Sequence, residues 1–262
     1  MRWDAETLWE QVQPLLPGFT VEVLPQIDST NSELMRRARA GQLEPTLLIA
    51  EHQTAGRGRL GRQWLSEGQG GHTVPTVGAI PLSFSLGLPL SPQNWSGLSL
   101  AVGVSLARSL HPQVRLKWPN DLWLRGRKLA GILIETASFA SVRFVVIGVG
   151  INVAPRSAEG LSTPPAWLEE LAPEMDAAAA LHRVFLPLVQ TLQRFEGEGF
   201  APFAASFQAL DALAGCQVWL SDGTTGSARG VDSSGALQVL TSGGLQKITS
   251  SEVSVRPLAP SE

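Results

Sequence analysis

The chain has 262 residues and 44% hydrophobic content, which is enough for one large domain or for a domain with a small appendage. Its formal net charge of −3 argues against a general nucleic-acid-binding protein, because such proteins neutralise many phosphates with basic side chains. The single cysteine, Cys216, cannot form an internal disulfide, and no stretch approaches the roughly 20 apolar residues of a membrane span. The N-terminus also lacks the apolar core of a signal peptide. We therefore expect a cytoplasmic protein that binds neither DNA nor a membrane.

The first half of the chain predicts a domain that contains both helices and strands. Residues 1–25 indicate a short helix followed by a strand. Thr30 and Glu33 have the spacing of a helix-capping box, and Gly41 marks the end of a helix over residues 31–40. The elements expected next are a strand over 46–51, a mobile loop over 66–81, a strand over 82–88 and a buried helix over 95–110.

The second half predicts more strands, a helical region and a change of character near residue 213. Strand-like runs occupy 114–118, 128–136 and 142–153, and the first two are joined by a hairpin around Gly126. Residues 174–213 have apolar positions at the spacings of a helix. Residues 215–255 alternate short β-prone runs with glycine-containing turns, which is typical of a small barrel of about five strands. We therefore expect two domains, residues 1–212 and residues 213–262.

Residues 56–62 carry the strongest chemical signal in the chain. Three glycines alternate there with Arg57, Arg59 and Arg62. Glycine allows close approach of the backbone to a ligand, and arginine matches the geometry of carboxylates and phosphates. The stretch contains a formal G-x-G-x-x-G, but a dinucleotide-binding fingerprint needs a helix at that point, and further glycines and Pro75 follow instead. The loop predicts either a binding site for an anionic small molecule or an ordinary solvated basic loop.

Two further polar clusters follow at strand ends. Lys117, Asn120 and Asp121 would suit a nucleotide phosphate, through Mg²⁺ held by Asn120 and Asp121 if that ion is present. Lys128 opens the next strand, and Gly131 within it indicates close approach of a ligand or of another backbone. The ordinary alternatives are a Pro-Asn turn and an exposed lysine at the start of a strand.

A third cluster, Ser29-Thr30-Asn31, stands at the start of the first long helix. Its hydroxyl and amide groups would serve a small polar ligand as donors and acceptors. Helix capping alone also explains these residue types.

These elements, in this order, resemble the biotin protein ligases. Five motifs carry the resemblance: Asp28-Ser29-Thr30-Asn31, the run from Glu51 to Trp64, Lys117-Trp118-Pro119-Asn120-Asp121, the run from Arg127 to Glu135, and Ile147-Gly148-Val149-Gly150-Ile151-Asn152. The resemblance extends over about residues 22–257. It implies an α+β fold in which helices flank a mixed sheet, as in the class II aminoacyl-tRNA synthetases, with a small SH3-like barrel at the C-terminus.

The resemblance also implies an ATP-dependent ligase. In that reaction the carboxylate of biotin attacks the α-phosphate of ATP, which gives biotinyl-5′-AMP and pyrophosphate. A lysine of a biotin carboxyl carrier protein then takes the biotin, and AMP leaves. ATP and biotin are the expected substrates, with Mg²⁺, and the carrier subunit of acetyl-CoA carboxylase is the expected partner. The chain is expected to be a monomer or homodimer, and a ligase without a DNA-binding domain because the ligase motifs begin by residue 28.

The resemblance assigns roles to individual residues. Arg59 and Lys128 are expected to be catalytic, because cations must offset the repulsion between an anionic carboxylate and an anionic phosphate. The expected biotin-binding residues are Ser29, Thr30, Asn31, Gln53, Arg57, Gly58, Arg59, Lys128 and Gly131. The expected nucleotide-binding residues are Arg57, Arg59, Arg62, Trp64, Lys117, Asn120 and Asp121. Trp64 and Trp118 are expected to flank the apolar parts of the ligands.

Two other functions stay open from the sequence. A lipoate or octanoyl ligase or transferase has a similar fold, but it is expected to lack the Gly/Arg loop. A non-catalytic sensor of biotin or nucleotide would have no need of Lys128 and the arginines. Residues 68–81 depart from the pattern of the family, so no contact is assigned to that segment.

Overall fold

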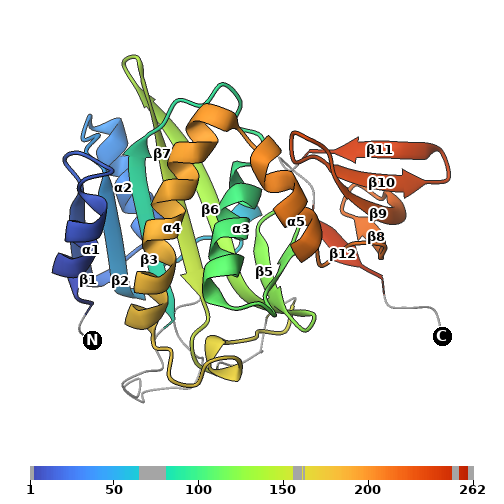
Figure 1. The fold of residues 1–262 in the computed structure, drawn as a ribbon, viewed down its shortest axis with the longest axis horizontal. Helices are drawn as coiled ribbons and strands as arrows, with labels where there is room; N and C mark the ends of the chain where they lie inside the picture. The colour runs from blue at the N-terminus through green and yellow to red at the C-terminus, as the bar shows by residue number, and fades with distance from the viewer. Residues whose placement is uncertain (1–2, 65–80, 156–160, 162, 250–253, 259–262) are drawn as a thin grey trace.

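The computed structural model describes residues 3–64, 81–155, 161, 163–249 and 254–258 (Figure 1). The loop predicted over residues 66–81, and with it the unusual segment 68–81, lies outside the described residues except for Pro81. Most of the other predicted elements are present, with the differences given below.

A mixed sheet of seven strands forms the centre of the molecule, in the order β1-β2-β3-β7-β6-β5-β4. In chain order the strands are β1 (Thr20–Ile27), β2 (Thr46–Gln53), β3 (Leu82–Pro89), β4 (Arg115–Lys117), β5 (Asp121–Leu124), β6 (Arg127–Phe139) and β7 (Val142–Ile151). Strands β1 and β2 are parallel, and every other neighbouring pair is antiparallel. The mixed sheet expected from the sequence is confirmed.

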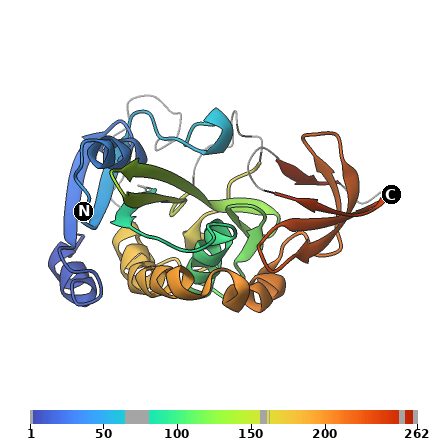
Figure 2. The same cartoon turned by 90° about the horizontal axis from the view of Figure 1, so that it is seen from above.

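Helices cover the two faces of this sheet unequally. The long α4 (Ala177–Glu198), α3 (Leu98–Leu110) and α5 (Ala204–Leu210) lie on one face, and α2 (Thr30–Arg39) lies on the other (Figure 2). The short α1 (Ala5–Val12) packs against β1 and α4. Within the described residues, no helix is long and apolar enough to cross a membrane.

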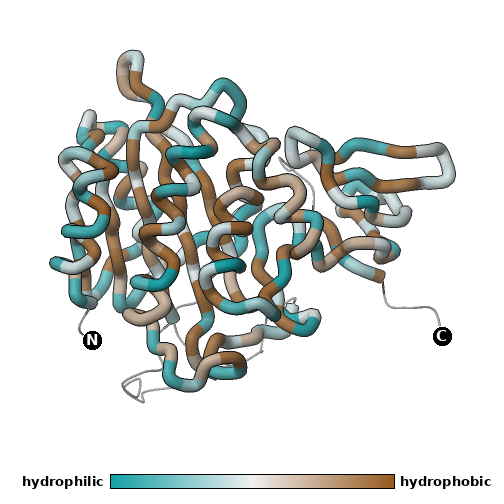
Figure 3. The backbone as a smooth tube through the Cα atoms, viewed as in Figure 1, coloured by the Kyte–Doolittle hydropathy of each residue, from teal (hydrophilic) through white to brown (hydrophobic). Residues whose placement is uncertain are grey.

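Side-chain alternation along the strands supplies a core to each face. On β2, Leu47 and Ile49 belong to the large core beneath α3 and α4, whereas Leu48 packs with Leu34 and Met35 of α2. Hydrophobic residues accordingly run along the central strands and the inner side of α4 (Figure 3). The face that carries α2 is only partly covered by apolar packing, which leaves room on it for a cavity.

The start of α2 differs from the prediction. Its N-cap is Ser29 rather than Thr30, and the Ser29 hydroxyl accepts a hydrogen bond from the backbone N–H of Ser32. Glu33 does not close a capping box but forms ion pairs with Arg36 and Arg37. Thr30 is buried instead, which directs its hydroxyl into the protein. The end of the helix is as predicted, since Gly41 follows it in the left-handed region with φ +86°.

Two other predicted elements need correction. The link between β4 and β6, expected as one hairpin, contains the additional short strand β5, which pairs with both neighbours. Its four residues are too few to show a period, although the turn at Gly126 is where the sequence places it. The helical region at 174–213 is also interrupted, because Gly199 ends α4 with φ +67° before α5 begins.

The five strands expected near the C-terminus are confirmed. Their order is β11-β10-β9-β8-β12, all antiparallel, and the arrangement is consistent with an SH3-like fold. Their bounds are β8 (Gln217–Leu220), β9 (Thr225–Val231), β10 (Leu237–Thr241), β11 (Gly244–Ile248) and β12 (Val255–Pro257). The division at residues 212 and 213 stays a prediction.

Trp118 does not flank a ligand cavity, contrary to the expectation from the sequence. Its ring is fully buried and does not line the cavity described below. The indole Nε1 donates to the carbonyl of Gly235 at 3.1 Å, which joins the central sheet to the C-terminal sheet. A tryptophan at the end of a strand can face either a ligand or a neighbouring domain, and here it faces the domain.

Candidate functional site

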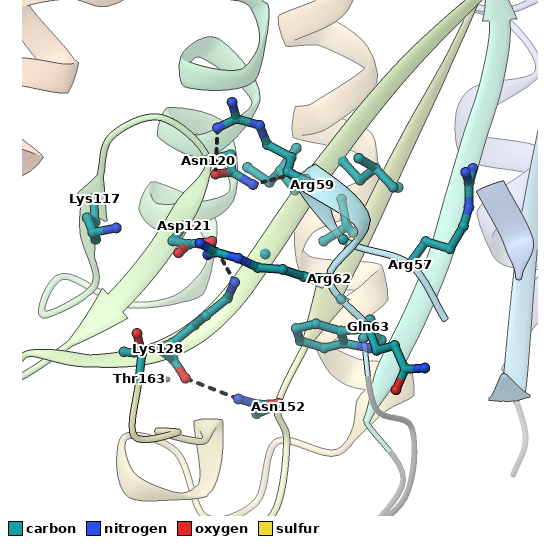
Figure 4. Close-up of a pocket in the computed structure, with 18 of the residues that line it drawn as sticks. Arg57, Arg59, Arg62, Gln63, Lys117, Asn120, Asp121, Lys128, Asn152 and Thr163 are labelled. Atoms are coloured by element: carbon teal, nitrogen blue, oxygen red, sulfur yellow. Dashed lines mark hydrogen bonds and ion pairs between the residues drawn. The ribbon is translucent and has the colours of Figure 1, made fainter. Parts of the chain in front are cut away.

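A cavity of about 390 Å³ lies beside the N-terminus of α2 and collects the predicted site residues. Figure 4 shows part of its lining, with Lys117, Asp121 and Lys128 at one end and Arg57 at the other. Every residue expected to bind biotin or nucleotide lines it: Ser29, Thr30, Asn31, Gln53, Arg57, Gly58, Arg59, Arg62, Trp64, Lys117, Asn120, Asp121, Lys128 and Gly131. The segments that carry these residues are far apart in sequence, so the fold itself assembles the site.

Strand register builds the floor of the cavity from small residues. One row across the sheet pairs Gly131 with Gly150 and Gly150 with Ser83. The next row pairs Gly148 with Ser85 on β3. Successive residues of a strand point to opposite faces, so glycines and serines two positions apart lie on the same face. Side chains from α2 and from the Gly/Arg loop can therefore approach the sheet closely.

Two of these glycines are sterically required. A Cβ on Gly148 would lie 2.0 Å from Asn31 Oδ1, and one on Gly150 would lie 2.3 Å from Cε2 of Trp64. The indole of Trp64 rests over Gly150, and its Nε1 donates to Ser83 Oγ at 3.3 Å. The sequence alone indicates no individual role for Gly148 or Gly150. Their signal was glycine at alternate positions within an otherwise apolar strand.

The end of the cavity formed by Ser29, Thr30, Asn31 and Gln53, here called the amide end, is a compact polar network. The backbone N–H of Thr30 donates to Gln53 Oε1 at 2.9 Å. The amide nitrogen of Asn31 donates to the Leu133 carbonyl at 3.3 Å and to Glu135 at 3.0 Å. These helix and strand residues are buried or nearly so, and their orientations are fixed by one another.

The arginines of the Gly/Arg loop are each held by a polar partner. Arg57 forms an ion pair with Glu135, and Arg62 donates at 2.9 Å to Ser254, which directly precedes β12 of the C-terminal sheet. Arg59 donates to Asn120 Oδ1 at 3.3 Å, and burial lowers the pKa of its guanidinium from the ordinary value. The loop thus spans the cavity from the amide end to the C-terminal sheet.

The end formed by Lys117, Asp121, Lys128 and Arg62, here called the cationic end, has more positive than negative groups. Lys128 Nζ lies 2.7 Å from Asp121 Oδ1. The pKa of Lys117 is lowered to about 8, chiefly by burial; Asp121 opposes this shift, and the nearby cations Lys128 and Arg62 add to it. The Lys117 ammonium lies 5.3 Å from the ring centroid of Trp123. An anionic ligand would relieve the crowding of like charges.

Asn152 holds the backbone next to Lys128, a role that the sequence alone does not indicate. Its side-chain nitrogen donates to the carbonyls of Lys128 at 3.1 Å and Ala166 at 3.0 Å. It thereby fixes the backbone at the start of β6, where Lys128 enters the cavity (Figure 4). Asn152 follows the glycine pair of β7, so the motif Gly148-x-Gly150-x-Asn152 serves both ends of the cavity.

The donor set suits a magnesium ion only in part. Asp121 is the only carboxylate among the described residues that line the cavity, and within that same part of the chain no group of three acidic, histidine or cysteine side chains could hold a metal. Mg²⁺ commonly uses one or two carboxylates together with substrate phosphates and water. Asp121 therefore fits an ion that arrives with a phosphate ligand.

Comparison with known proteins gives the family. The model described as the Biotin/lipoate A/B protein ligase family matches residues 23–152, and the Biotin protein ligase C terminal domain matches residues 217–256. The Bifunctional ligase/repressor BirA of Escherichia coli is 37% identical over 258 residues, which cover 94% of this chain and 77% of the relative. This chain belongs to the biotin protein ligase family. The resemblance drawn from the five sequence motifs is thereby confirmed.

Other members of the biotin protein ligase family agree in sequence and fold. The Biotin--[acetyl-CoA-carboxylase] ligase of Mycobacterium tuberculosis is 33% identical, over 89% of this chain and 88% of its own. The structure of the biotin protein ligase from Aquifex aeolicus in complex with biotin and ATP superimposes with a TM-score of 0.74 at 30% identity, covering 91% of this chain and 99% of that one. The expected α+β fold with an SH3-like C-terminal part is confirmed.

Proposed function

We propose that this chain is an ATP-dependent biotin protein ligase, which makes biotinyl-5′-AMP and transfers biotin to a lysine of a biotin carboxyl carrier protein. The observation that carries the proposal is the cavity, which has a neutral polar network at one end and a surplus of cations at the other. Biotin has a neutral ureido ring and a carboxylate, and ATP brings phosphates. One cavity with these two ends suits the joined product of both substrates.

The lipoate alternative is less well supported. The family model over residues 23–152 covers biotin and lipoate ligases alike, but the one over residues 217–256 is specific to biotin protein ligases. Related proteins from Mycobacterium tuberculosis and Paracoccus denitrificans are named biotin--[acetyl-CoA-carboxylase] ligases. A dithiolane ring also has no N–H or carbonyl group for the amide end to bind.

The first step joins two anions, and the cationic end supplies the compensation. An oxygen of the biotin carboxylate attacks the α-phosphorus of ATP, and pyrophosphate leaves. In the proposal Lys128 binds the carboxylate and the α-phosphate, and Lys117 and Arg62 bind phosphate oxygens. Preorganised charges of this kind stabilise a transition state in which negative charge accumulates. The ion pair of Lys128 with Asp121 holds the ammonium in place before the substrates meet.

Magnesium would enter with ATP in this proposal. Asp121 is the protein ligand that we assign to it, and the nucleotide phosphates would provide further oxygens. The ion would neutralise phosphate charge. Asn120 was the second magnesium ligand considered from the sequence. Its Oδ1 accepts a hydrogen bond from Arg59, and its Nδ2 donates to the Ile132 carbonyl at 2.7 Å. We therefore assign Asn120 to positioning Arg59 and the backbone of β6, and not to the ion.

The second step needs the intermediate to be kept from water. A mixed anhydride hydrolyses, so a loop that covers it protects the product until the carrier lysine attacks the acyl carbon and AMP leaves. We assign this cover to the Gly/Arg loop, with Arg59 facing the phosphate and Trp64 stacked against the floor over Gly150. The carrier of acetyl-CoA carboxylase is the proposed partner. The predicted oligomeric state, cytoplasmic location and lack of DNA binding stay predictions.

Release of pyrophosphate tests the proposal. The purified chain, given ATP and biotin, should release pyrophosphate and then label an added biotin carboxyl carrier domain. Parallel reactions contain lipoate or octanoate in place of biotin, or no acid. Release with lipoate but not with biotin would favour the alternative ligase, and binding of biotin without any release would favour a sensor.

A further inference from the structure

A buried hydroxyl beneath the amide end joins two of its residues. Ser85 lies on β3, is 0% exposed and does not itself line the cavity. Its Oγ lies 2.7 Å from Thr30 Oγ1 and 2.6 Å from Asn31 Oδ1. A serine hydroxyl has one hydrogen, so it can donate to only one of these oxygens. The groups around it decide which.

The orientation of Asn31 is set from its other side. Its amide nitrogen lies 3.3 Å from the Leu133 carbonyl and 3.0 Å from a carboxylate oxygen of Glu135. The carbonyl can only accept, and Glu135 is an acceptor because it is ion-paired with Arg57. The NH₂ group of Asn31 therefore points to these two, and its Oδ1 points to Ser85. Since Oδ1 can only accept, Ser85 donates its single hydrogen to Asn31.

This bond fixes the hydroxyl of Thr30 in turn. The single hydrogen of Ser85 is donated to Asn31. The 2.7 Å contact between Ser85 Oγ and Thr30 Oγ1 is therefore a hydrogen bond only if Thr30 donates to Ser85 Oγ. The other acceptor near the Thr30 hydroxyl, Gln53 Oε1, is farther away at 3.2 Å. Thr30 Oγ1 thus directs its hydrogen inward, and it keeps lone pairs for a ligand in the cavity that it lines.

The amide of Gln53 has the complementary polarity. The backbone N–H of Thr30, which can only donate, lies 2.9 Å from Gln53 Oε1 and fixes which end of the amide faces the helix. The remaining NH₂ group of Gln53 has no hydrogen-bond partner among the residues that the structure describes. The amide end therefore offers a hydrogen-bond acceptor on Thr30 beside a donor on Gln53.

We propose that Ser85 is a positioning residue that sets this polarity and thereby selects a ligand ring carrying an N–H beside a carbonyl. The inference rests on the proposed function, because the ureido ring of biotin has that pattern. A ring without N–H groups would leave the oxygen of Thr30 and the amide of Gln53 unpaired in a buried place, which is costly. Ser85 acts through Thr30 and Asn31, without touching the ligand.

Replacing Ser85 by alanine tests the inference. In Ser85→Ala, Asn31 Oδ1 loses its donor and Thr30 is free to turn its hydrogen toward Gln53 or the ligand. We expect the Kd for biotin, measured by calorimetry, to rise about tenfold. The KM for ATP, and kcat at saturating biotin, should change less than twofold. Ser105→Ala is the matched control, because Ser105 is also a buried serine, its hydroxyl has no partner in the described part of the chain, and it lies outside the cavity.

A biotin analogue methylated on a ureido nitrogen separates polarity from stability. The unaltered chain should prefer biotin over this analogue, and Ser85→Ala should lose several-fold of that preference because Thr30 no longer presents a fixed acceptor. A merely structural role would weaken both ligands equally. If Ser85→Ala does not fold, Ser85→Cys serves instead, because the thiol is a weaker donor and should give an intermediate Kd and an intermediate preference.

Binding of biotin to the unaltered chain separates the two proposals. If that chain does not bind biotin, the proposed function fails. If it binds biotin, and Ser85→Ala binds biotin and the methylated analogue as the unaltered chain does within twofold, the inference about Ser85 is overturned while the function stands.

Discussion

At the amide end of the cavity, neutral hydrogen bonds run from Thr30 through Ser85 to Asn31, and each oxygen and nitrogen has a defined direction. At the cationic end, Lys117 and Lys128 face each other across Asp121, and burial lowers the pKa of Lys117. The amide end is closely hydrogen-bonded and leaves an acceptor on Thr30 and a donor on Gln53 for the ligand, whereas the cationic end is short of negative charge. The amide end therefore determines which ligand ring is bound, and the cationic end binds the negative charges of the substrates.

The largest expected effect comes from removing the central cation. Lys128→Ala should slow single-turnover formation of biotinyl-5′-AMP by about 10²- to 10³-fold, because Lys128 is assigned to the charge that accumulates in this step. The Kd for biotin should change far less, since the amide end is intact. Lys247→Ala, at an exposed lysine of the C-terminal sheet, is the control and should react normally. A normal rate of adenylation in Lys128→Ala would show that the cationic end does not contribute to adenylate formation.

A different step should fail when the loop arginine is removed. Arg59→Ala should form the adenylate at a rate within about tenfold of normal but release it roughly ten- to a hundredfold faster, because a charged hydrogen bond to the phosphate is lost. Free adenylate in the medium and labelling of unrelated lysines are the readouts. Arg108→Ala, at an exposed arginine on α3, is the control. Equal adenylation defects in Arg59→Ala and Lys128→Ala would contradict this division of labour.

The floor between the two ends should tolerate no side chain. Gly150→Ala places a Cβ 2.3 Å from the ring of Trp64 and should displace the indole, so that KM for ATP rises about tenfold. Gly197→Ala is the matched control, because nothing lies within 4 Å of its Cβ and it lies in α4. That variant should gain about 0.5–1 kcal/mol in free energy of unfolding. A Gly150→Ala protein with unchanged kinetics would mean that Trp64 does not contribute to the site.

The smallest expected effect is a dependence on pH. Burial lowers the pKa of Lys117 to about 8, so its ammonium is charged below pH 8 and loses its proton as the pH rises through that value. Because the charged form attracts phosphate, KM for ATP should rise about threefold between pH 7 and pH 9. In Lys117→Arg, which keeps its charge, the KM should not vary over this range. The same slope in both proteins would exclude Lys117 as its source.

Much of this molecule follows from its sequence. Capping residues predict α2, and an apolar run predicts α3. Every residue assigned to biotin or nucleotide from the five motifs lines the cavity, but so do residues outside those motifs, such as Phe84 and Trp123. The N-cap of α2 was misassigned to Thr30 because capping and ligand-binding residues have the same chemistry. Trp118 was misplaced because nothing local distinguishes a ligand-facing ring from one beneath another sheet.

Cross-strand register explains what the sequence left out. Ser83, Ser85, Gly148 and Gly150 become one surface only when β3 pairs with β7. The direction in which the Thr30 hydroxyl donates depends on Ser85, which is distant in sequence. It also depends on how many hydrogens each neighbouring group can donate, which a sequence motif does not show. Such features are properties of the assembled sheet, and single motifs do not contain them.

The most direct measurement is a crystal structure of this chain with a non-hydrolysable analogue of biotinyl-5′-AMP. We predict that the ureido N–H will donate to Thr30 Oγ1, that the ureido carbonyl will accept from Gln53, and that the phosphate will lie between Lys128 and Arg59. A ligand bound in the opposite direction, or a ureido ring that makes no contact with Thr30 and Gln53, would contradict this prediction.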